Sequence, residues 1–327
     1  MAAIFTTSAP QLKLDQHEDQ QTPRHHSLDQ PLHSTLRTQL ATLPTPIKAP
    51  FGQMRRLLDT LLSNPTLAAS LNNTYPKRGI FKTAALTNTN SDQKLTLDIS
   101  PSRLELLPAS LRTELGPDFD AVVSFFQSVE RVHVPQILAA LSQLVGFDMS
   151  RLHAARNLNF RLCDYIPSTA NPDSSNGCGA HRDYGTFSII FQDKTALTAL
   201  EAEVSPGIWV PVPPDATVVV CGWCAAVLSG GEIKAVRHRV RRVPGVRRIS
   251  AVLFVAPDLE VKLRPFDEGK WKYFSDEIIH GNVDVEGFKE VMGKKWRHRE
   301  GNEDITLNGQ DSEVDQDDDI QRLVWAD

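Results

Sequence analysis

Residues 181–193 read HRDYGTFSIIFQD, a β-prone apolar run that opens with charged side chains. Side chains two residues apart on a strand face the same side, so we expect His181 and Asp183 to project together while Arg182 turns away. An isolated His-x-Asp sequence usually reflects nothing more than a half-buried histidine paired with a carboxylate. A further metal-ligating residue elsewhere in the chain would favour a metal site instead.

Short apolar runs of the same kind continue on both sides of this stretch. Glycine and proline clusters separate them, and many short strands at regular spacing are typical of an antiparallel sandwich or jelly roll. We therefore predict a mostly β core with flanking helices. The runs that support this fold class are NLNFRLCDY, TFSIIF, ATVVVC, AVRHRV and RRISAVLFVAP, all between residues 157 and 257.

Composition divides the 327 residues into five segments. Residues 1–30 are polar and are expected to form a flexible N-terminal arm. Residues 31–150 carry leucines at helical spacing, which predicts a helical region that packs on the barrel. The β core occupies residues 151–262, a C-terminal helical segment follows at 263–300, and residues 301–327 form an acidic tail that we expect to be disordered.

Bulk properties argue against several classes of protein. A net charge of −5 is not that of a general nucleic-acid binder, and four cysteines are too few for a disulfide scaffold at this length. The first residues lack the basic and apolar regions of a signal peptide, and no apolar run is long enough to span a bilayer. We therefore expect a cytoplasmic protein with no membrane and no nucleic-acid partner.

A second histidine changes the interpretation of His181 and Asp183. The run RHRV places His238 on another strand, where alternation turns Arg237, Arg239 and Arg241 to the opposite face. Two imidazoles and one carboxylate brought together by the fold are the facial ligand set of non-haem Fe(II) oxygenases. Such a set leaves coordination positions open for a bidentate cosubstrate and for O2.

An arginine and a serine follow on the next strand. Arg248 and Ser250 share one face of RRISAVLFV, and a guanidinium that points into a closed barrel requires an anion, because an unpaired buried charge is costly. The planar fork of arginine suits a carboxylate, to which the serine hydroxyl can add a hydrogen bond. A dicarboxylate with a 2-keto acid end would chelate iron and reach Arg248 with its other end.

The combined pattern of His181-x-Asp183, His238 and Arg248-x-Ser250 resembles the Fe(II)/2-oxoglutarate dioxygenases, and more narrowly the branch related to isopenicillin N synthase and flavonoid oxygenases. This resemblance implies a double-stranded β-helix (jelly-roll) fold, Fe(II) held by the two histidines and the aspartate, 2-oxoglutarate held by the Arg/Ser pair, and O2 as oxidant. Tyr165 matches a family tyrosine that binds the cosubstrate. Where relatives have asparagine two residues earlier, this chain has Cys163.

Alternation also suggests residues that contact a substrate. Phe254 faces the same way as Arg248 and would either stack on a flat ring or pack in the core. Arg161 and Asn159 share a face with Tyr165, and the arginine would either anchor an acidic phenol, enol or carboxylate or form a structural ion pair. Further candidates for the pocket are Phe187 and Trp223, the latter with core packing as the alternative.

The chain as a whole looks similar to oxygenases of fungal polyketide secondary metabolism, in particular to those that expand a ring during tropolone biosynthesis. The resemblance implies a small polyketide-derived ring substrate, loss of hydrogen from a methyl group of a dearomatised cyclohexadienone, and expansion to a tropolone. Hydroxylation of an aryl methyl or an aliphatic C–H bond is the alternative. Segments 80–110 and 266–290 flank the barrel and are candidate lids.

Three rival functions rest on single features. Cys221-Gly-Trp-Cys224 is a CxxC sequence, but it follows a strand of a β region rather than a βαβ unit, so we interpret both cysteines as structural. RHRVRRVPGVRR holds six arginines without an aromatic stacking platform, which favours a solvent-facing strand over nucleic-acid binding. A binding protein without activity is disfavoured because all the expected ligands are present.

Overall fold

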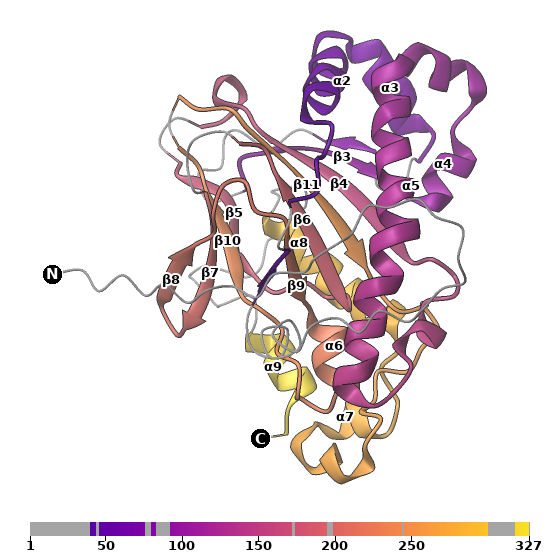
Figure 1. Ribbon diagram of the computed structural model, residues 1–327, viewed down its shortest axis with the longest axis vertical. Helices are drawn as coiled ribbons and strands as arrows, with labels where there is room; N and C mark the ends of the chain where they lie inside the picture. Colours follow the sequence, from indigo (N-terminus) through magenta and orange to yellow (C-terminus); the bar gives the residue numbers. More distant parts are fainter. Residues whose placement is uncertain are drawn as a thin grey trace, which may run out of the picture.

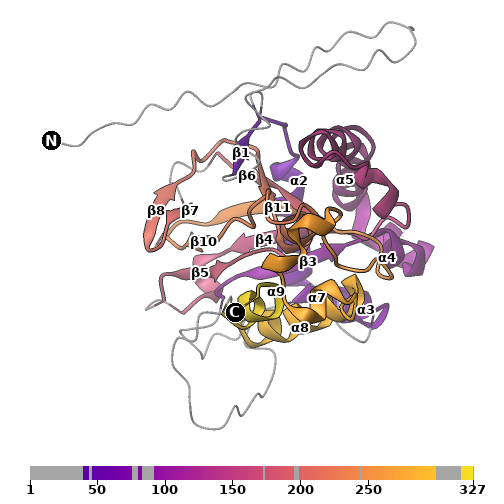
Figure 2. The same ribbon diagram turned by 90° about the horizontal axis from the view of Figure 1, so that it is seen from below.

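The apolar runs form two antiparallel sheets that face each other in the computed structural model (Figures 1 and 2). The structure describes residues 40–43, 46–75, 80–82, 92–171, 174–194, 199–243, 245–299 and 318–326. The larger sheet has the order β1 (Ala41–Thr42), β9 (Val218–Cys221), β6 (Phe187–Gln192), β11 (Arg248–Val255), β4 (Leu158–Tyr165), β3 (Leu95–Ile99) and β2 (Phe81–Lys82). The smaller sheet has the order β5 (Asn176–His181), β10 (His238–Arg241), β7 (Leu200–Ser205) and β8 (Ile208–Pro211).

Helices cover the face of the larger sheet that points away from the smaller one (Figure 2). The long helix α5 supplies Phe125 and Phe126, whose rings pack on Phe160 of β4, and Phe125 also meets Phe191 of β6 edge-on at 5.1 Å. The predicted β core with flanking helices is therefore confirmed. The helices are α2 (Phe51–Ser63), α3 (Pro65–Asn73), α4 (Pro101–Leu106), α5 (Ala109–Val145), α6 (Trp223–Leu228), α7 (Asp276–Ile279), α8 (Val285–Arg299) and α9 (Asp318–Val324).

The larger sheet separates two apolar cores, because its side chains alternate between its faces. On β4, Phe160 and Leu162 belong to the helix-side core, whereas Cys163 and Tyr165 belong to a second cluster between the sheets. That second cluster includes few large side chains, and polar residues share the same face. The space between the sheets is therefore where a polar site fits.

The region before residue 150 is not only helical. It also supplies β1, β2 and β3, and all five residues of β3 are buried in the larger sheet. The expectation of a lid across 80–110 is wrong for this part of the segment, because a fully paired internal strand cannot move independently of its sheet. The predicted N-terminal arm, residues 1–30, lies outside the described residues.

The acidic tail ends in an ordered helix. Residues 301–317 lie outside the described residues, but Ile320 and Val324 of α9 are fully buried in the helix-side core. The ring of Trp325 packs on Phe274 at 4.7 Å between centroids. The expectation of a disordered tail is thus wrong for residues 318–326. Within the described ranges, no helix combines the length and apolar character needed to cross a bilayer.

Candidate active site

Two neighbouring strands of the smaller sheet bring the candidate metal ligands together. β5 ends at His181 and β10 begins at His238, and the two histidines are direct partners in the antiparallel register. Asp183 follows β5 by two residues, and one ligand atom from each of the three side chains lies within 4.8 Å of the others. The Nε2 atoms of His181 and His238 lie 3.5 Å and 4.0 Å from the Asp183 carboxylate oxygens.

Backbone carbonyls orient both imidazoles. The Nδ1 of His181 lies 2.8 Å from the Gly179 carbonyl oxygen, and the Nδ1 of His238 lies 3.1 Å from that of Val236. A carbonyl oxygen only accepts, so in the neutral imidazole each Nδ1 carries the proton and donates, and Nε2 is the nitrogen that would bind a metal. This partner on the second ring nitrogen is the usual arrangement for a metal-binding histidine.

The Asp183 carboxylate is held in its charged form. Burial disfavours the charge, but the attraction of His238 and His181 in their protonated forms and the hydrogen bond from Ser188 together outweigh burial and keep the pKa of Asp183 well below its usual value. The Ser188 hydroxyl donates to Asp183 Oδ2 at 2.6 Å. Two neutral imidazole nitrogens and one carboxylate are a donor set that suits Fe(II), so the residues present fit the metal that the sequence predicts.

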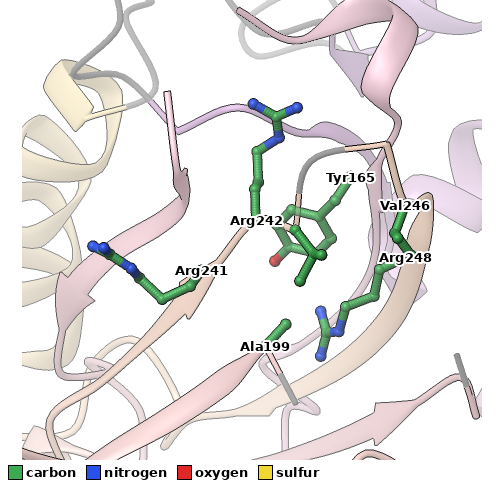
Figure 3. Close-up of a pocket in the computed structure, with 7 residues that line it drawn as sticks. Tyr165, Ala199, Arg241, Arg242, Val246 and Arg248 are labelled. Atoms are coloured by element: carbon green, nitrogen blue, oxygen red, sulfur yellow. The ribbon is translucent and has the colours of Figure 1, made fainter. Parts of the chain in front are cut away.

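A buried guanidinium lies on the interior face of the larger sheet. Arg248 is 6% exposed, and its Nη2 donates to Gln192 Oε1 at 3.0 Å. Its Nη1 is buried and has no hydrogen-bond partner among the described residues. Tyr165 is its register partner on β4, with the ring 5.2 Å from the guanidinium carbon, and Figure 3 shows both side chains directed toward one small pocket beside Ala199. An unpaired donor in this position requires an anion.

The strand register orders the interior side chains into successive rows across β6, β11, β4 and β3. The row that contains Ser188 is the one next to the candidate metal ligands, because Ser188 donates a hydrogen bond to Asp183. The row that contains Arg248 lies at the opposite end of the strands. A site for a dicarboxylate therefore runs along the strands between these two ends. In spatial order, starting beside the candidate metal ligands, the rows are Ser188, Phe254 and Asn159; then Ile190, Val252, Arg161 and Asp98; then Gln192, Ser250, Cys163 and Thr96; then Arg248 and Tyr165.

Of the two interpretations of Arg161, the ion pair is present. Its Nε and Nη2 donate to the two oxygens of Asp98 at 2.8 and 3.1 Å. Asn159 Nδ2 also donates to Asp98, at 2.8 Å, and Asn159 Oδ1 accepts from Arg103 Nη1 at 2.6 Å. These hydrogen bonds join two guanidiniums, one amide and one carboxylate in a single network. Arg161 also lies over the ring of Phe254, 5.9 Å from its centroid.

Two predicted substrate contacts lie on the wrong side of the sheet. Phe187 alternates with Ser188 on β6 and is fully buried in the helix-side core. Trp223, at the start of α6, is 3% exposed in the same core, where Arg182 lies over its ring at 5.6 Å. The expectation for Phe187 is corrected, because a side chain on the helix side of the larger sheet cannot reach the space between the sheets. For Trp223, of the two interpretations, core packing is the one observed.

The predicted outward arginines lie on the outer face of the smaller sheet. Arg237 pairs with Glu203 at 3.1 Å and Arg239 with Glu201 at 2.6 Å. Contrary to expectation, an aromatic side chain accompanies them, since both guanidiniums lie over the ring of Trp209, at 5.4 and 4.0 Å. The arginines cover that ring and are paired with acids, so this surface does not present the bare stacking platform that single-stranded nucleic acids use.

Sequence reasoning missed several polar residues that complete the site. Ser188 and Gln192 alternate with apolar residues on β6, and Asp98 and Thr96 alternate with leucines on β3. The signal that could have found them is this period of two within 94–98, KLTLD, which places polar side chains on one face. Because Thr96 and Asp98 face the space between the sheets, β3 lacks the continuous run of apolar residues that marks its neighbours.

Comparisons with known proteins agree with this geometry. A family model described as the 2OG-Fe(II) oxygenase superfamily matches residues 156–257, which span β4 to β11 and include all three metal-ligand candidates and the Arg/Ser pair. Over these residues the chain is similar to the 2OG-Fe(II) oxygenase superfamily. Curated relatives also match part of the chain.

Two of those relatives are a plant and a fungal protein. Scopoletin 8-hydroxylase of Arabidopsis thaliana is 32% identical over 107 residues, 32% of this chain and 29% of its own length. The 2-oxoglutarate-dependent dioxygenase tropC of Talaromyces stipitatus is 36% identical over 115 residues, 34% of this chain and 34% of its own length. The chain thus spans about a third of the length of these relatives.

The structural similarity extends beyond the oxygenase region. The crystal structure of full-length Neurospora crassa T7H with alpha-KG superposes with a TM-score of 0.58 at 19% identity, over 80% of this chain and 90% of that chain. The alignment therefore includes the N-terminal helices and strands as well as the two facing sheets. The predicted double-stranded β-helix, or jelly-roll, fold is confirmed.

Proposed function

We propose that the protein is a non-haem Fe(II)- and 2-oxoglutarate-dependent oxygenase that acts on a small molecule. The observation that carries this proposal is the Nη1 of buried Arg248, which has no hydrogen-bond partner among the described residues and lies on the sheet that faces a His/Asp/His ligand set. A metal site alone fits many functions. A metal site with an anion site at the other end of the space between the sheets fits a dicarboxylate chelator.

Each residue then has a defined task. His181, Asp183 and His238 hold Fe(II), while Arg248, Ser250 and Tyr165 bind the distal carboxylate of 2-oxoglutarate. Fe(II) with 2-oxoglutarate and O2 supplies the oxidising power that removes hydrogen from an unactivated C–H bond, with succinate and CO2 as by-products. The protein positions the reacting carbon beside the ligand set and excludes water from the apolar space around it.

The test is 2-oxoglutarate binding to the anaerobic Fe(II) protein, followed by succinate release in air. His181→Ala is expected to abolish both Fe(II) binding and succinate release. His280→Ala, on the exposed end of α7, is the matched control and should behave as the parent. Full succinate release by His181→Ala would overturn the ligand assignment.

For the substrate we propose a polyketide-derived ring with an acidic oxygen, bound near Phe254 and Asn159. The two guanidiniums of the Arg103–Asp98–Arg161 network support an enol, phenol or carboxylate in this position. The partial similarity to a fungal dioxygenase named tropC supports ring expansion of a dearomatised methyl-cyclohexadienone to a stipitaldehyde-type tropolone.

The alternative is hydroxylation, which the similarity to a scopoletin 8-hydroxylase supports. Both reactions begin with loss of the same hydrogen atom, so product analysis decides between them. Incubation with a methylated cyclohexadienone aldehyde should yield the seven-membered ring. An unexpanded alcohol as the sole product would replace ring expansion with hydroxylation.

A further inference from the structure

A buried lysine lies beside the anion site and has no role in the function described so far. The side chain of Lys94, in the segment just before β3, is 4% exposed. Its ammonium donates to Asp92 Oδ2 at 2.9 Å and to the Cys178 sulfur at 3.0 Å. A buried ammonium is costly and needs the partners that stabilise its charge.

The register places this lysine at the distal end of the interior rows. Leu95, the first residue of β3, is opposite Asp164, so Lys94, which directly precedes it, falls level with Tyr165. Tyr165 is itself the register partner of Arg248. Cys178, the sulfur partner of Lys94, belongs to the same interior cluster as Cys163 and Tyr165. Lys94 therefore shares the surface to which the cosubstrate's distal carboxylate is assigned.

The charge on Lys94 is secure. Burial disfavours it, but the attraction of Asp92, together with those of Cys178, Tyr165 and Cys163, outweighs burial and holds the pKa of Lys94 well above its usual value. The Asp92 carboxylate is itself fixed, because its Oδ1 accepts from the Gly179 backbone N–H at 2.8 Å. The lysine is thus a fixed cation and not a titrating group at neutral pH.

One of its donors is available. An ammonium has three N–H bonds, and among the described residues Lys94 has two hydrogen-bond partners, Asp92 and Cys178. Nearby, burial raises the pKa of the Cys163 thiol to about 11, against the opposing charge of Lys94, so this thiol stays neutral. A neutral thiol is a weak donor. The position beside Ser250 on β4, which Cys163 occupies, therefore offers no strong hydrogen-bond donor.

We propose that Lys94 is a further cosubstrate-binding residue, whose third N–H donates to the distal carboxylate of the bound 2-keto dicarboxylate alongside Arg248. This inference rests on the proposed function. Asp92 balances the lysine charge, so the contribution is a directed, charge-assisted hydrogen bond rather than a gain in net charge.

The experiment measures binding without turnover. The Asp92→Asn/Lys94→Met double variant removes the ammonium without leaving a buried carboxylate unpaired, and the amide oxygen introduced at position 92 still accepts from the Gly179 N–H. In Mn(II)-loaded protein, calorimetric titration compares 2-oxoglutarate with oxalate, which chelates the metal but has no distal carboxylate. We expect the Kd for 2-oxoglutarate to rise about 10- to 100-fold and that for oxalate to stay within about twofold. Lys262→Met, which removes an exposed lysine, is the matched control.

The outcomes separate this inference from the proposed function. No binding of 2-oxoglutarate by the Mn(II)-loaded parent protein would overturn both. Tight binding by the parent and an unchanged Kd in the variant would overturn only the role of Lys94. An equal loss for 2-oxoglutarate and oxalate would mean that Lys94 only maintains the fold around the metal, and would also overturn it. If the double variant does not fold by circular dichroism, Lys94→Gln is titrated in the same way, with the same outcomes.

Discussion

A single hydroxyl fixes the carboxylate of the candidate metal centre. Ser188 donates to Asp183 Oδ2 at 2.6 Å, and it comes from β6, a strand of the opposite sheet. Such partners orient a ligand and are worth roughly 10- to 100-fold in metal affinity. The bond therefore ties the metal ligands of the smaller sheet to the interior wall of the larger one.

Ser188→Ala should weaken Fe(II) binding by about 10- to 100-fold while leaving the fold intact, because the site loses orientation but no ligand. Competition with a chromophoric chelator under anaerobic conditions measures the change. Ser205→Ala, at the exposed end of β7, is the control. An unchanged Fe(II) affinity would mean that the two histidines hold Asp183 in place without the hydroxyl.

At this scale the sequence predicts which three candidate ligands converge, but it predicts the surrounding residues poorly. Alternation on single strands was enough to place His181, Asp183 and His238 on inward faces. It also placed Phe254, Arg161 and Asn159 correctly, since all lie on the interior rows. It could not reveal Asp98 as the partner of Arg161, because that pairing depends on which strand lies next to β4.

The element that limits the anion site is β5, where a glycine lies against an aromatic ring. A Cβ added at Gly177 would lie 3.0 Å from two ring atoms of Tyr165 and 3.0 Å from the Val240 carbonyl oxygen. These distances are shorter than ordinary contacts, so the tyrosine ring would have to shift. The glycine thus allows β5 to approach Tyr165, the proposed cosubstrate-binding tyrosine, closely.

Gly177→Ala should raise the Kd for 2-oxoglutarate several-fold, about 3- to 10-fold, by displacing the Tyr165 ring, while Fe(II) affinity stays the same. Titration of 2-oxoglutarate into the anaerobic Fe(II) protein measures this. Gly52→Ala on α2, where the nearest atom is the flexible end of Arg56 at 3.7 Å, controls for the added methyl group. Equal losses in metal and cosubstrate affinity would instead point to a general distortion of β5.

The β9–α6 connection contains two buried thiols. Cys221 ends β9 and Cys224 lies in α6, both fully buried, and burial raises the pKa of Cys221 to about 12 from 9.0. A thiol with a raised folded-state pKa contributes stability that is complete below pH 9 and is lost as pH rises toward 12, because the unfolded chain ionises first. This burial agrees with a structural interpretation of the CxxC sequence.

The free energy of unfolding, measured in urea, should therefore fall as the pH rises from 9.0 toward about 12, and Cys221→Ala/Cys224→Ala should show a smaller fall. Succinate release by the double variant should persist at about pH 7. The same pH-dependent fall in parent and variant would assign the alkaline loss to other groups. Loss of succinate release with an intact fold would mean that Cys221 and Cys224 have a functional role.

β3 shows why an element was harder to predict than its neighbours. A strand such as β9 presents apolar residues on both faces and stands out as an apolar run. On β3, Leu95 and Leu97 face the helices while Thr96 and Asp98 face the space between the sheets. A strand whose inner face serves a polar site resembles an irregular polar segment in sequence.

At the scale of the whole molecule, the end of the chain closes the helical layer. Ile320 and Val324 of α9 are fully buried, and backbone bonds link Ser275 to Val324 and Ala326 to Tyr273. Full burial of one such side chain is worth roughly 1.5–3 kcal/mol. The acidic composition of the tail concealed this anchor, because only the last few residues carry its apolar side chains.

Removal of residues 318–327 should lower the free energy of unfolding by about 3–6 kcal/mol, since two fully buried aliphatic side chains are lost. Fe(II) affinity should change little, because α9 packs in the helix-side core and not between the sheets. Urea unfolding and metal titration measure the two quantities. Asp319→Ala, on the exposed side of α9, is the control, and an unchanged stability after truncation would contradict the observed packing.

The larger sheet does not stop where the oxygenase region begins. β4 is paired on one side with β11 and on the other with β3, which comes from residues 95–99, and β9 is paired with β1 at residues 41–42. A chimera that joined residues 156–257 to a foreign N-terminal half would leave both strands with unsatisfied backbone groups. Recombination in this lineage, natural or engineered, is therefore constrained to breakpoints that carry β1 and β3 along with the ligand-bearing half.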